Sequence, residues 1–581
     1  MIVVGFFRWQ EVDESPLIMT DGQGYYAYLP ATFIYQDYSF GFVWGINDTY
    51  YPGEMAAKYV NNTPYGPINK YFVGTALMQS PFFLLSHAYA TFAGYKTDGY
   101  TTPYQVGVGV AGVFYACLGL WFLFGFLQRQ GFSDLTASLT SVMVLFGSNL
   151  LFYAVYEPGM SHVYSFCTVS AILNFSTGYL DSKRTKSLLG ASATLGLTAL
   201  IRPTNAIVLF ALPALTGSWS RLLIELKSLL ANRKHVFLFV SVGLAVASIQ
   251  PIIYYFQTGL PFVWPYGEEG FNFLKPEIAN VLFSYRRGLF VYSPILLVAL
   301  LGLILGIRKN PFRNVWLAIF LAVVTWIISS WWMWYYGGSF GHRAFVEYIP
   351  FLSLGLALII QGSIGSRLKK VVLSLSIPIC ALSVFQTYQY QKQILPYDEI
   401  DSKKYWELFL RSGDDLRWYH TPALGDGSYS ALDSTVIAHN MENELGWGNE
   451  HLLTEERAFG GSRSSKMSGT DQYGITFRYN TSKCNHQINT IRVSGQVSSN
   501  SQRSDLAYVC SIEDSAGVQK YWRSRVLRPQ FPWFRSWGKT YALFTIPFSC
   551  ASSDRITIFP VKTDDATVFV DDMEISLIFV E

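Results

Sequence analysis

The first residue whose type and position suggest chemistry is Asp21, in the segment Thr20–Tyr26 (TDGQGYY). It follows a short apolar stretch at the N-terminus and precedes a long segment rich in tyrosine, tryptophan and glycine. A carboxylate within hydrogen-bond reach of a hydroxyl group can take its proton, so Asp21 is a candidate general base. An aspartate before a glycine is also typical of an ordinary turn, and that alternative stays open on the sequence alone.

Isolated ionisable residues recur between the later apolar segments and are candidates for binding a charged substrate. An arginine can grip a phosphate with two hydrogen bonds, and cations neutralise the charge of a departing phosphate. For each of them the alternative is a long side chain that reaches out of an apolar surface into water. The candidates are Lys70, Glu157, His162, Arg202, Arg286, Arg287, His342 and Arg343.

Four of these residues lie in two short motifs. The segment Gly337–Arg343 (GGSFGHR) follows the aromatic run Trp331–Tyr336, and its glycines permit a substrate to approach the backbone closely. Glu157 and His162 lie five residues apart in the segment EPGMSH, where they can orient a substrate or hold a divalent metal ion. Two ligands in one loop do not by themselves make a metal site, so the sequence does not require a metal cofactor.

The composition indicates that membrane helices must position these residues. The 581 residues are 50% hydrophobic and 14% charged, whereas soluble proteins carry about 25% charged residues. The formal net charge of +3 gives no sign of a nucleic-acid-binding protein. Apolar runs predict a multi-spanning α-helical membrane protein with about ten spans plus interfacial helices. The runs are 104–127, 134–155, 163–180, 234–256, 287–306, 314–332, 346–363 and 369–387.

Charge bias predicts which loops share a side, because cytoplasmic loops are rich in lysine and arginine. All the basic loops fall on one side if 187–217 is a helical hairpin with its turn at Arg202. The candidate residues then lie on the opposite, extracytoplasmic side. The apolar segment 66–95 begins and ends on that side, so it is predicted to lie along the membrane interface. Residues 1–10 are too few to cross a bilayer, and we expect that the first helix is truncated. The basic loops are 128–129, 183–186, 221–235, 308–313 and 367–370.

The composition changes near residue 391. Residues 1–390 form the predicted membrane domain, 391–429 a linker with a short helix, and 430–581 a separate polar domain. In this last domain short runs alternate between apolar and polar residues and are separated by turn residues, which predicts an all-β sandwich. About 150 residues suffice for one such core.

The order of these features resembles the GT-C superfamily of polyprenyl-phosphate-dependent glycosyltransferases, in particular its protein O-mannosyltransferase and aminoarabinose-transferase branch. The likeness rests on the early outer-loop acid Asp21, on Pro67 with Lys70, and on Glu157 with His162 in the second outer loop. Further helices and an outer C-terminal domain follow in the same order. The chain departs from the mannosyltransferase pattern in that Asp21 is followed by glycine and not by glutamate.

This resemblance implies roles for particular residues. Asp21 is implied to act as the base of an inverting sugar transfer. Lys70, Arg287 and Arg343 are implied to hold the phosphate of the lipid donor. The departure at the first motif leaves the class of acceptor open.

The C-terminal domain resembles the jelly-roll sandwich of carbohydrate-binding modules. The likeness lies in its opening Asn440–Glu442, its turn Gly460–Ser462 and its closing Val570–Ile575. It implies that Glu442 and Asp572 hold a structural calcium ion, with solvated acids at strand ends as the alternative. Such a domain either binds sugar or forms a structural lid.

The sequence therefore favours an integral-membrane hexosyltransferase in a bacterial inner membrane, with its C-terminal domain outside the cytoplasm. Its predicted partners are a polyprenyl-phosphate sugar donor, the lipid bilayer, and a glycan, lipid or protein acceptor. An O-antigen-type glycan polymerase or ligase is one alternative, and a non-enzymatic glycan or lipid transporter is another. Transporters often contain matched broken helices, and this chain shows one break, at Arg202.

Overall fold

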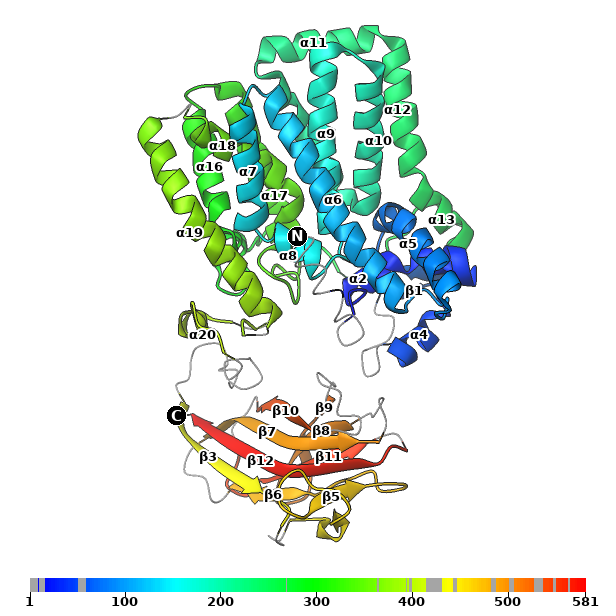
Figure 1. Cartoon of the computed structure of the whole chain (residues 1–581), viewed down its shortest axis with the longest axis vertical. Helices are drawn as coiled ribbons and strands as arrows, with labels where there is room; N and C mark the ends of the chain where they lie inside the picture. Colours follow the sequence, from blue (N-terminus) through cyan, green and yellow to red (C-terminus); the bar gives the residue numbers. More distant parts are fainter. Residues whose placement is uncertain are drawn as a thin grey trace. The chain divides into compact units, whose positions relative to one another are not determined.

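The computed structural model describes residues 9, 16–50, 59–267, 269–362, 365–392, 394–396, 400–413, 431–442, 447–481, 487–500, 506–526, 537–546, 550–562 and 565–580. The chain divides into two compact units, Met1–Asn47 with Ala56–Lys392 and Asp48–Met55 with Gln393–Glu581. The first unit is helical and the second is built of strands (Figure 1). A helical part followed by an all-β part is the order that the sequence predicts.

The first unit combines long helices with short helices and one hairpin. In chain order it contains α2 (Asp21–Tyr26), α3 (Tyr28–Pro30), η1 (Ala31–Tyr35), α4 (Val43–Tyr50), β1 (Val60–Thr63), β2 (Gly66–Asn69), α5 (Gly74–Ala93), α6 (Thr102–Arg129), α7 (Asp134–Gly147), α8 (Leu150–Val155), α9 (His162–Ser182), α10 (Thr185–Ile201), η2 (Pro203–Thr216), α11 (Trp219–Ala231), α12 (Arg233–Ala247), α13 (Ile249–Thr258), α14 (Ile278–Phe283), α15 (Leu289–Tyr292), α16 (Pro294–Gly306), α17 (Pro311–Ser329), η3 (Arg343–Tyr348), α18 (Ile349–Ile360) and α19 (Ser366–Gln391).

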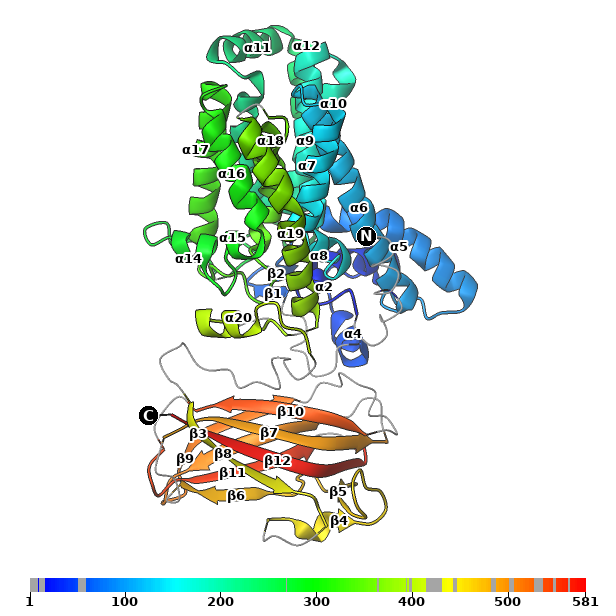
Figure 2. The ribbon, with the colours of Figure 1, turned by 60° about the vertical axis from the view of Figure 1, so that its left-hand side comes forward.

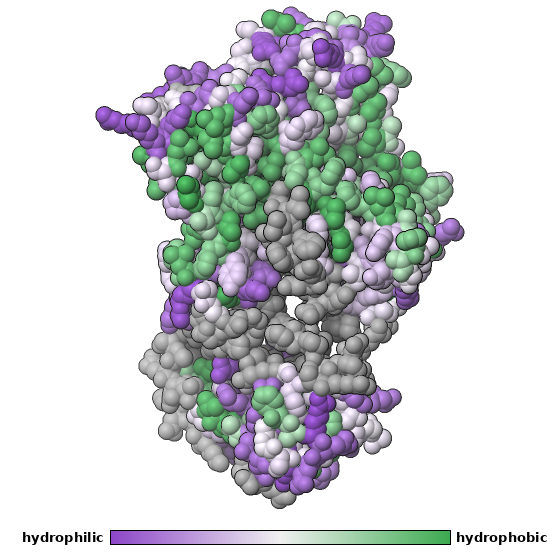
Figure 3. Space-filling model, in the orientation of Figure 1, coloured by the Kyte–Doolittle hydropathy of each residue, from purple (hydrophilic) through white to green (hydrophobic). Residues whose placement is uncertain are grey.

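The two ends of the helical unit differ in character. Helix α11 lies across one end, whereas α2, α14, α15 and the β1–β2 hairpin lie at the other (Figure 2). At the α11 end, Lys183 pairs with Glu225, and Arg313 donates to Gln130 over 3.4 Å. Hydrophobic side chains form a belt over the helices, and hydrophilic ones gather at the α11 end (Figure 3). The basic loops therefore share one end, and Asp21 lies at the other.

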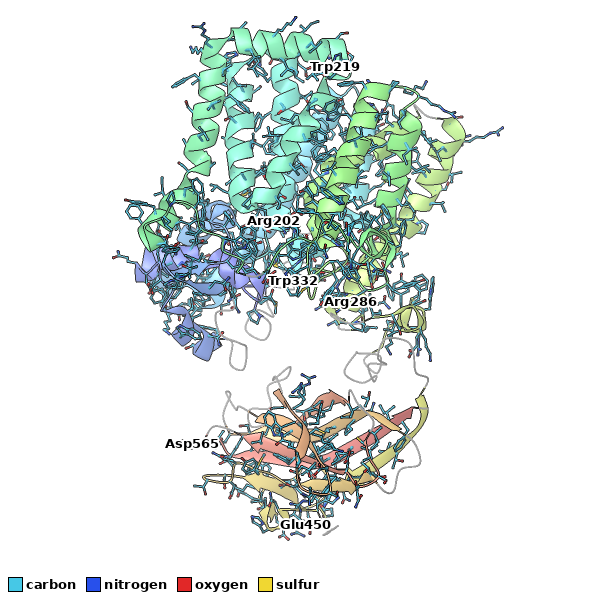
Figure 4. The ribbon with its side chains drawn as sticks, turned by 180° about the vertical axis from the view of Figure 1, so that it is seen from behind. Arg202, Trp219, Arg286, Trp332, Glu450 and Asp565 are labelled. Atoms are coloured by element: carbon cyan, nitrogen blue, oxygen red, sulfur yellow. The ribbon has the colours of Figure 1, made fainter. Side chains whose placement is uncertain are left out.

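The helix break at Arg202 is present as predicted. Helix α10 ends at Ile201, Arg202 is extended (φ −151°, ψ 116°), and the 3-10 helix η2 begins at Pro203. Proline cannot continue a helix without losing a hydrogen bond. Arg202 and Trp219 lie at opposite ends of the helical unit (Figure 4), so α10 and η2 form a hairpin. The following helix α11 is bent by 115° from η2.

The predicted number of about ten spans is not confirmed. Among the described residues, five helical segments are long and apolar enough to cross a membrane, or six if the bent pair η2 and α11 counts as one span. They are α6, α12 with α13, α17, η3 with α18, and α19. The predicted span 134–155 is divided into α7 and α8, and the predicted span 287–306 into α15 and α16. The polar residues Ser148, Asn149 and Ser293 interrupt them. The N-terminal stub, on which the expected truncation depends, lies largely outside the described residues.

Helices α16 and α18 approach each other so closely that only glycine fits between them. A methyl group on Gly302 would lie 2.1 Å from the carbonyl oxygen of Gly355. A methyl group on Gly355 would lie 1.9 Å from the carbonyl oxygen of Ala299. Small residues at crossings are the usual means by which membrane helices pack, because van der Waals contact replaces the hydrophobic drive.

The second unit is an antiparallel β-sandwich, as predicted. One sheet has the order β10–β7–β12–β5–β4 with β3 also paired to β12, and the other has the order β6–β11–β8–β9. Strand β11 alternates between outward and buried side chains along its whole length, which is the pattern of a strand with one face on a core. The helix α20 (Ser402–Leu408) lies in the predicted linker. The strands are β3 (Ala431–His439), β4 (Leu453–Thr454), β5 (Ser464–Met467), β6 (Phe477–Asn480), β7 (Gln487–Ser499), β8 (Leu506–Glu513), β9 (Gln519–Val526), β10 (Gly538–Thr545), β11 (Arg555–Lys562) and β12 (Val568–Val580).

Candidate active site

Asp21 opens helix α2 and forms an ion pair with Arg343. Asp21 Oδ2 accepts a hydrogen bond of 2.8 Å from Arg343 Nη2, and the two side chains are 32% and 13% exposed. Burial acts to raise the pKa of Asp21, but the Arg343 guanidinium, the Tyr71 hydroxyl and the Lys70 ammonium outweigh it. The pKa of Asp21 therefore lies below its ordinary value, and the carboxylate is ionised at neutral pH.

The glycine motif before η3 delivers Arg343 to this position. Gly337 and Gly341 have φ values of +67° and +58°, which favour glycine because it lacks a Cβ atom. Between them and Arg343, His342 Nε2 donates to the carbonyl oxygen of Trp334 over 3.0 Å. Burial lowers the pKa of His342 to about 3. His342 is therefore neutral at pH 7 and offers a phosphate no charge.

Arg202 and His162 converge on an acid that the sequence reasoning missed, Glu347. Glu347 is fully buried on η3. Its Oε1 lies 2.9 Å from Arg202 Nη1, and its Oε2 lies 3.1 Å from His162 Nδ1. A signal for this residue was present in the sequence, because an acid inside a predicted span is costly and is a functional candidate by default.

Lys70 also has a carboxylate partner. It follows β2 and contacts Glu269 Oε1 at 2.5 Å. Its ammonium lies 5.4 Å from the ring centre of Tyr266. The Asn61 side chain donates to the carbonyl oxygen of Pro265 over 2.6 Å. The β1–β2 hairpin and the loop around residue 265 are thus held together beside Asp21.

Arg287 differs from these cations, because no carboxylate among the described residues forms an ion pair with its guanidinium. The residue is 1% exposed. Its Nη1 donates to the carbonyl oxygen of Arg286 over 2.5 Å, while Nε and Nη2 have no hydrogen-bond partner among the described residues. The ring centre of Tyr390 lies 5.8 Å from the central carbon of the Arg287 guanidinium. A buried cation with two unpaired N–H groups is the pattern of a site that receives an anion. Arg286 is placed differently, with its guanidinium 3.6 Å from the ring centre of Tyr335.

Glu157 lies in the loop between α8 and α9, which packs against α2. A methyl group on Gly22 would lie 3.2 Å from the backbone of Gly159, and Met160 Sδ lies 3.9 Å from Arg343 Nη1. Glu157 Oε2 is buried and has no hydrogen-bond partner among the described residues. Burial raises the pKa of Glu157 to about 7, with Asp21 acting in the same direction and Arg343 and Arg287 against it.

Tyrosines fill the space between these groups. The Ser161 hydroxyl donates to the Tyr25 hydroxyl over 3.1 Å, and the rings of Tyr25 and Tyr71 lie 4.4 Å apart. The charges of Arg202, Asp21 and Arg343 all act on Tyr25. The structure therefore brings Asp21, Lys70, Glu157 and Arg343 together, with the pairs of Arg202 and His162 to Glu347 beside them.

The residues present do not fit a protein-held metal ion at this end. Glu157 and His162, the predicted pair, are not joined, since His162 pairs with Glu347. Across the described ranges no group of three His, Cys, Asp or Glu side chains is arranged to hold a metal ion. No catalytic step is therefore assigned to a metal here.

In the sandwich, Glu442 and Asp572 meet at one turn. Glu442 Oε1 accepts from the backbone amides of Ser462 and Arg463 over 2.8 and 2.9 Å. A methyl group on Gly461 would lie 2.3 Å from Glu442 Oε1, and one on Gly460 would lie 3.3 Å from Asp572 Oδ2. Two carboxylates thus flank consecutive glycines. Calcium takes six to eight oxygen ligands, so carbonyl groups would have to supply the others.

Comparison with known proteins gives likenesses of fold. No sequence family and no curated protein matches the chain. The sandwich is similar to the xylan-binding CBM22-1 domain of Paenibacillus barcinonensis Xyn10C, with 16% identity, a TM-score of 0.20, and coverage of 26% of this chain and 100% of that domain. TmCBM61 in complex with β-1,4-galactotriose matches with 9% identity and a TM-score of 0.15, covering 26% of this chain and 90% of that one.

A larger part of the chain is similar to the apo oligosaccharyltransferase of Archaeoglobus fulgidus. The identity is 10% and the TM-score 0.34, and the match covers 61% of this chain and 53% of that enzyme. The match thus spans about half the length of that enzyme. At these levels of identity the likenesses concern the fold and not the activity.

Proposed function

We propose that the chain is a GT-C-type, integral-membrane glycosyltransferase, which moves a sugar from a polyprenyl-phosphate donor to an acceptor hydroxyl. The observation that carries the proposal is the buried Arg287 guanidinium. Its Nε and Nη2 have no hydrogen-bond partner among the described residues, and its charge acts on Glu157 beside the ionised Asp21. An anion-binding site and a carboxylate base at one end of a membrane-helix unit are the two parts that such a transfer needs.

The phosphate of the donor binds Arg287, and Arg343 and Lys70 supply further positive charge. Arg287 is the primary contact because its Nε and Nη2 are buried and have no hydrogen-bond partner among the described residues. Arg343 and Lys70 are engaged with Asp21 and Glu269 in the empty protein. They reach the phosphate by exchanging partners. The apolar belt of the helical unit supports the polyprenyl chain.

Asp21 takes the proton of the acceptor hydroxyl. The acceptor oxygen then attacks the anomeric carbon on the face opposite the phosphate, and the bond between that carbon and the phosphate oxygen breaks. The configuration at the anomeric carbon is therefore inverted. The acceptor is a glycan, lipid or protein hydroxyl on the extracytoplasmic face of a bacterial inner membrane, and the sandwich lies on the same face and binds glycan. Glu442 and Asp572 are proposed to hold calcium there.

The test is transfer by the purified full-length protein in proteoliposomes, with a panel of labelled polyprenyl-phosphate sugars. Asp21→Asn is expected to lower the rate by about 10²–10⁴-fold. The matched control is Asp134→Asn, an exposed acid in the first turn of α7, which is expected to keep the full rate. Unchanged transfer by Asp21→Asn together with loss in Arg343→Gln would instead favour a glycan polymerase or ligase. Movement of lipid-linked sugar across the vesicle membrane without a new glycosidic bond would indicate a transporter.

A further inference from the structure

The proposed mechanism uses Asp21 as its general base and gives Glu157 no role, although the Glu157 loop packs against α2. This loop packs through Gly159 against Gly22, the residue after Asp21, and contacts Arg343 through Met160. The charges of Arg343 and Arg287 both act on the Glu157 carboxyl. Glu157 therefore lies close enough to Asp21, Arg343 and Arg287 for their charges to act on its carboxyl group.

The surroundings of Glu157 favour its neutral form. Oε2 is buried without a hydrogen-bond partner among the described residues, and a buried, unpaired, ionised carboxylate oxygen carries a large desolvation cost. The groups that face it are Asp21 from α2, Tyr153 from α8, and the two cations Arg287 and Arg343. Burial raises the pKa of Glu157 to about 7, whereas the pKa of Asp21 lies below its ordinary value.

Two neighbouring carboxyl groups whose environments separate their protonation states are suited to opposite roles, one as acid and one as base. Asp21 carries a guanidinium partner that keeps it ionised. Glu157 Oε2 is buried and has no hydrogen-bond partner among the described residues. A protonated Glu157 would place an O–H donor at that oxygen, where a bound phosphate can accept the hydrogen bond.

We propose that Glu157 is the general acid of the transfer and protonates the departing lipid phosphate. The proposal rests on the proposed function. The acceptor O–H bond breaks and its proton goes to Asp21, while the acceptor oxygen forms a bond to the anomeric carbon. The bond between that carbon and the phosphate oxygen breaks, and both of its electrons go to that oxygen. The oxygen then takes the proton of Glu157. Asp21 ends protonated and Glu157 ionised, and transfer of one proton from Asp21 to Glu157 through water restores the starting state.

The pH dependence of transfer tests this role. Glu157 acts in its protonated form, which is present below its pKa and is lost as pH rises. In the wild type we expect kcat/KM to fall as pH rises above about 7. The pH profile of kcat should show the same fall at a higher pH. The negative charge of the bound phosphate disfavours the ionisation of Glu157 and so raises its pKa. Glu157→Gln should lower kcat by about 10²–10⁴-fold and should abolish this fall. Glu157→Asp should restore part of the rate together with the fall.

A structural role for Glu157 would give a different result. Glutamine keeps the size of the side chain and offers an N–H donor where the protonated glutamate offers an O–H donor. If Glu157 is the general acid, Glu157→Gln should therefore still bind the lipid phosphate product with an unchanged Kd and should keep its Tm. A Glu157→Gln enzyme that transfers sugar within about threefold of the wild-type rate, too small a loss for general acid catalysis, overturns the proposal. A Glu157→Gln variant whose kcat/KM still falls above pH 7 also overturns the proposal. If Glu157→Gln fails to fold, the position of the fall in Glu157→Asp decides the question in the same way. Asp21→Asn separates the two ideas, because full activity in that variant refutes the proposed function itself.

Discussion

Replacement of Arg287 by methionine is expected to stabilise the protein while it abolishes donor binding. Each buried N–H group without a partner costs about 1–3 kcal/mol, and more when it is charged. Arg287 is 1% exposed, and its Nε and Nη2 have no hydrogen-bond partner among the described residues. Against this, methionine gives up the hydrogen bond to the Arg286 carbonyl and the contact with the Tyr390 ring, together about 2–3 kcal/mol. The middle of these ranges, about 4 kcal/mol relieved against about 2.5 kcal/mol lost, gives a net gain of about 1.5 kcal/mol in the free energy of unfolding.

The loss in donor affinity follows from the same two N–H groups. Each charge-assisted hydrogen bond to a phosphate oxygen contributes about 1.5–3 kcal/mol, so the pair accounts for about 3–6 kcal/mol. That corresponds to a rise of about 10²–10⁴-fold in the Kd of a polyprenyl phosphate. Thermal unfolding of the detergent-purified protein, with and without a polyprenyl phosphate, measures both effects. The wild-type Tm should rise with the lipid phosphate, and the Arg287→Met Tm should start higher and stay unchanged.

Arg286→Met is the matched stability control, because its guanidinium already has a partner in the Tyr335 ring at 3.6 Å. That variant loses a contact and should have a lower Tm than the wild type. If the Tm of Arg287→Met falls by as much as that of Arg286→Met, other groups already stabilise the buried charge of Arg287, and the predicted gain in stability is wrong. An unchanged response of Arg287→Met to the lipid phosphate would refute its role in binding.

Three further predictions concern the scaffold. Gly355→Ala is expected to lower the stability by about 1–3 kcal/mol through overpacking, seen as a lower Tm, whereas Gly45→Ala, where the new methyl group meets nothing within 4 Å, should not. Glu347→Gln is expected to lower it by about 1–3 kcal/mol, because the partly buried Arg202 loses its counter-charge and the buried His162 loses a carboxylate partner, while Glu225→Gln at a partly exposed pair should change it by less than about 1 kcal/mol. Calcium should raise the Tm of the wild type but not that of Glu442→Gln, and an equal rise in both would exclude a site at that acid.

The sequence was sufficient to place the candidate residues at one end of the helical unit. Hydropathy and the distribution of lysine and arginine depend on local composition, and both survive in the fold. The break at Arg202 was predictable for the same reason, because Pro203 ends a helix whatever surrounds it. The alternation of β11 likewise follows from one strand packed on one core.

The pairing of charges was not predictable from the sequence, because it depends on which loops meet. Lys70 finds Glu269 199 residues away, and Arg202 finds Glu347 145 residues away. The predicted spans 134–155 and 287–306 are divided for the same reason, a contact between segments far apart in the sequence. The Asn149 backbone amide donates to the Ser293 hydroxyl over 3.2 Å, so the interruptions of two separate helices support each other. A hydropathy window contains no information on such a contact.

The ion pair between Asp21 and Arg343 has a consequence for side reactions of the proposed transferase. The proposed base forms an ion pair with the same guanidinium that a donor phosphate would attract. If the phosphate draws Arg343 away, Asp21 becomes free only in molecules that already hold a donor. Asp21 without an ion-pair partner would then be present only in protein that holds a donor. An acceptor hydroxyl that enters before the donor would find no free carboxylate to take its proton. The order of events, donor before acceptor, would thus be set by a single hydrogen bond of 2.8 Å.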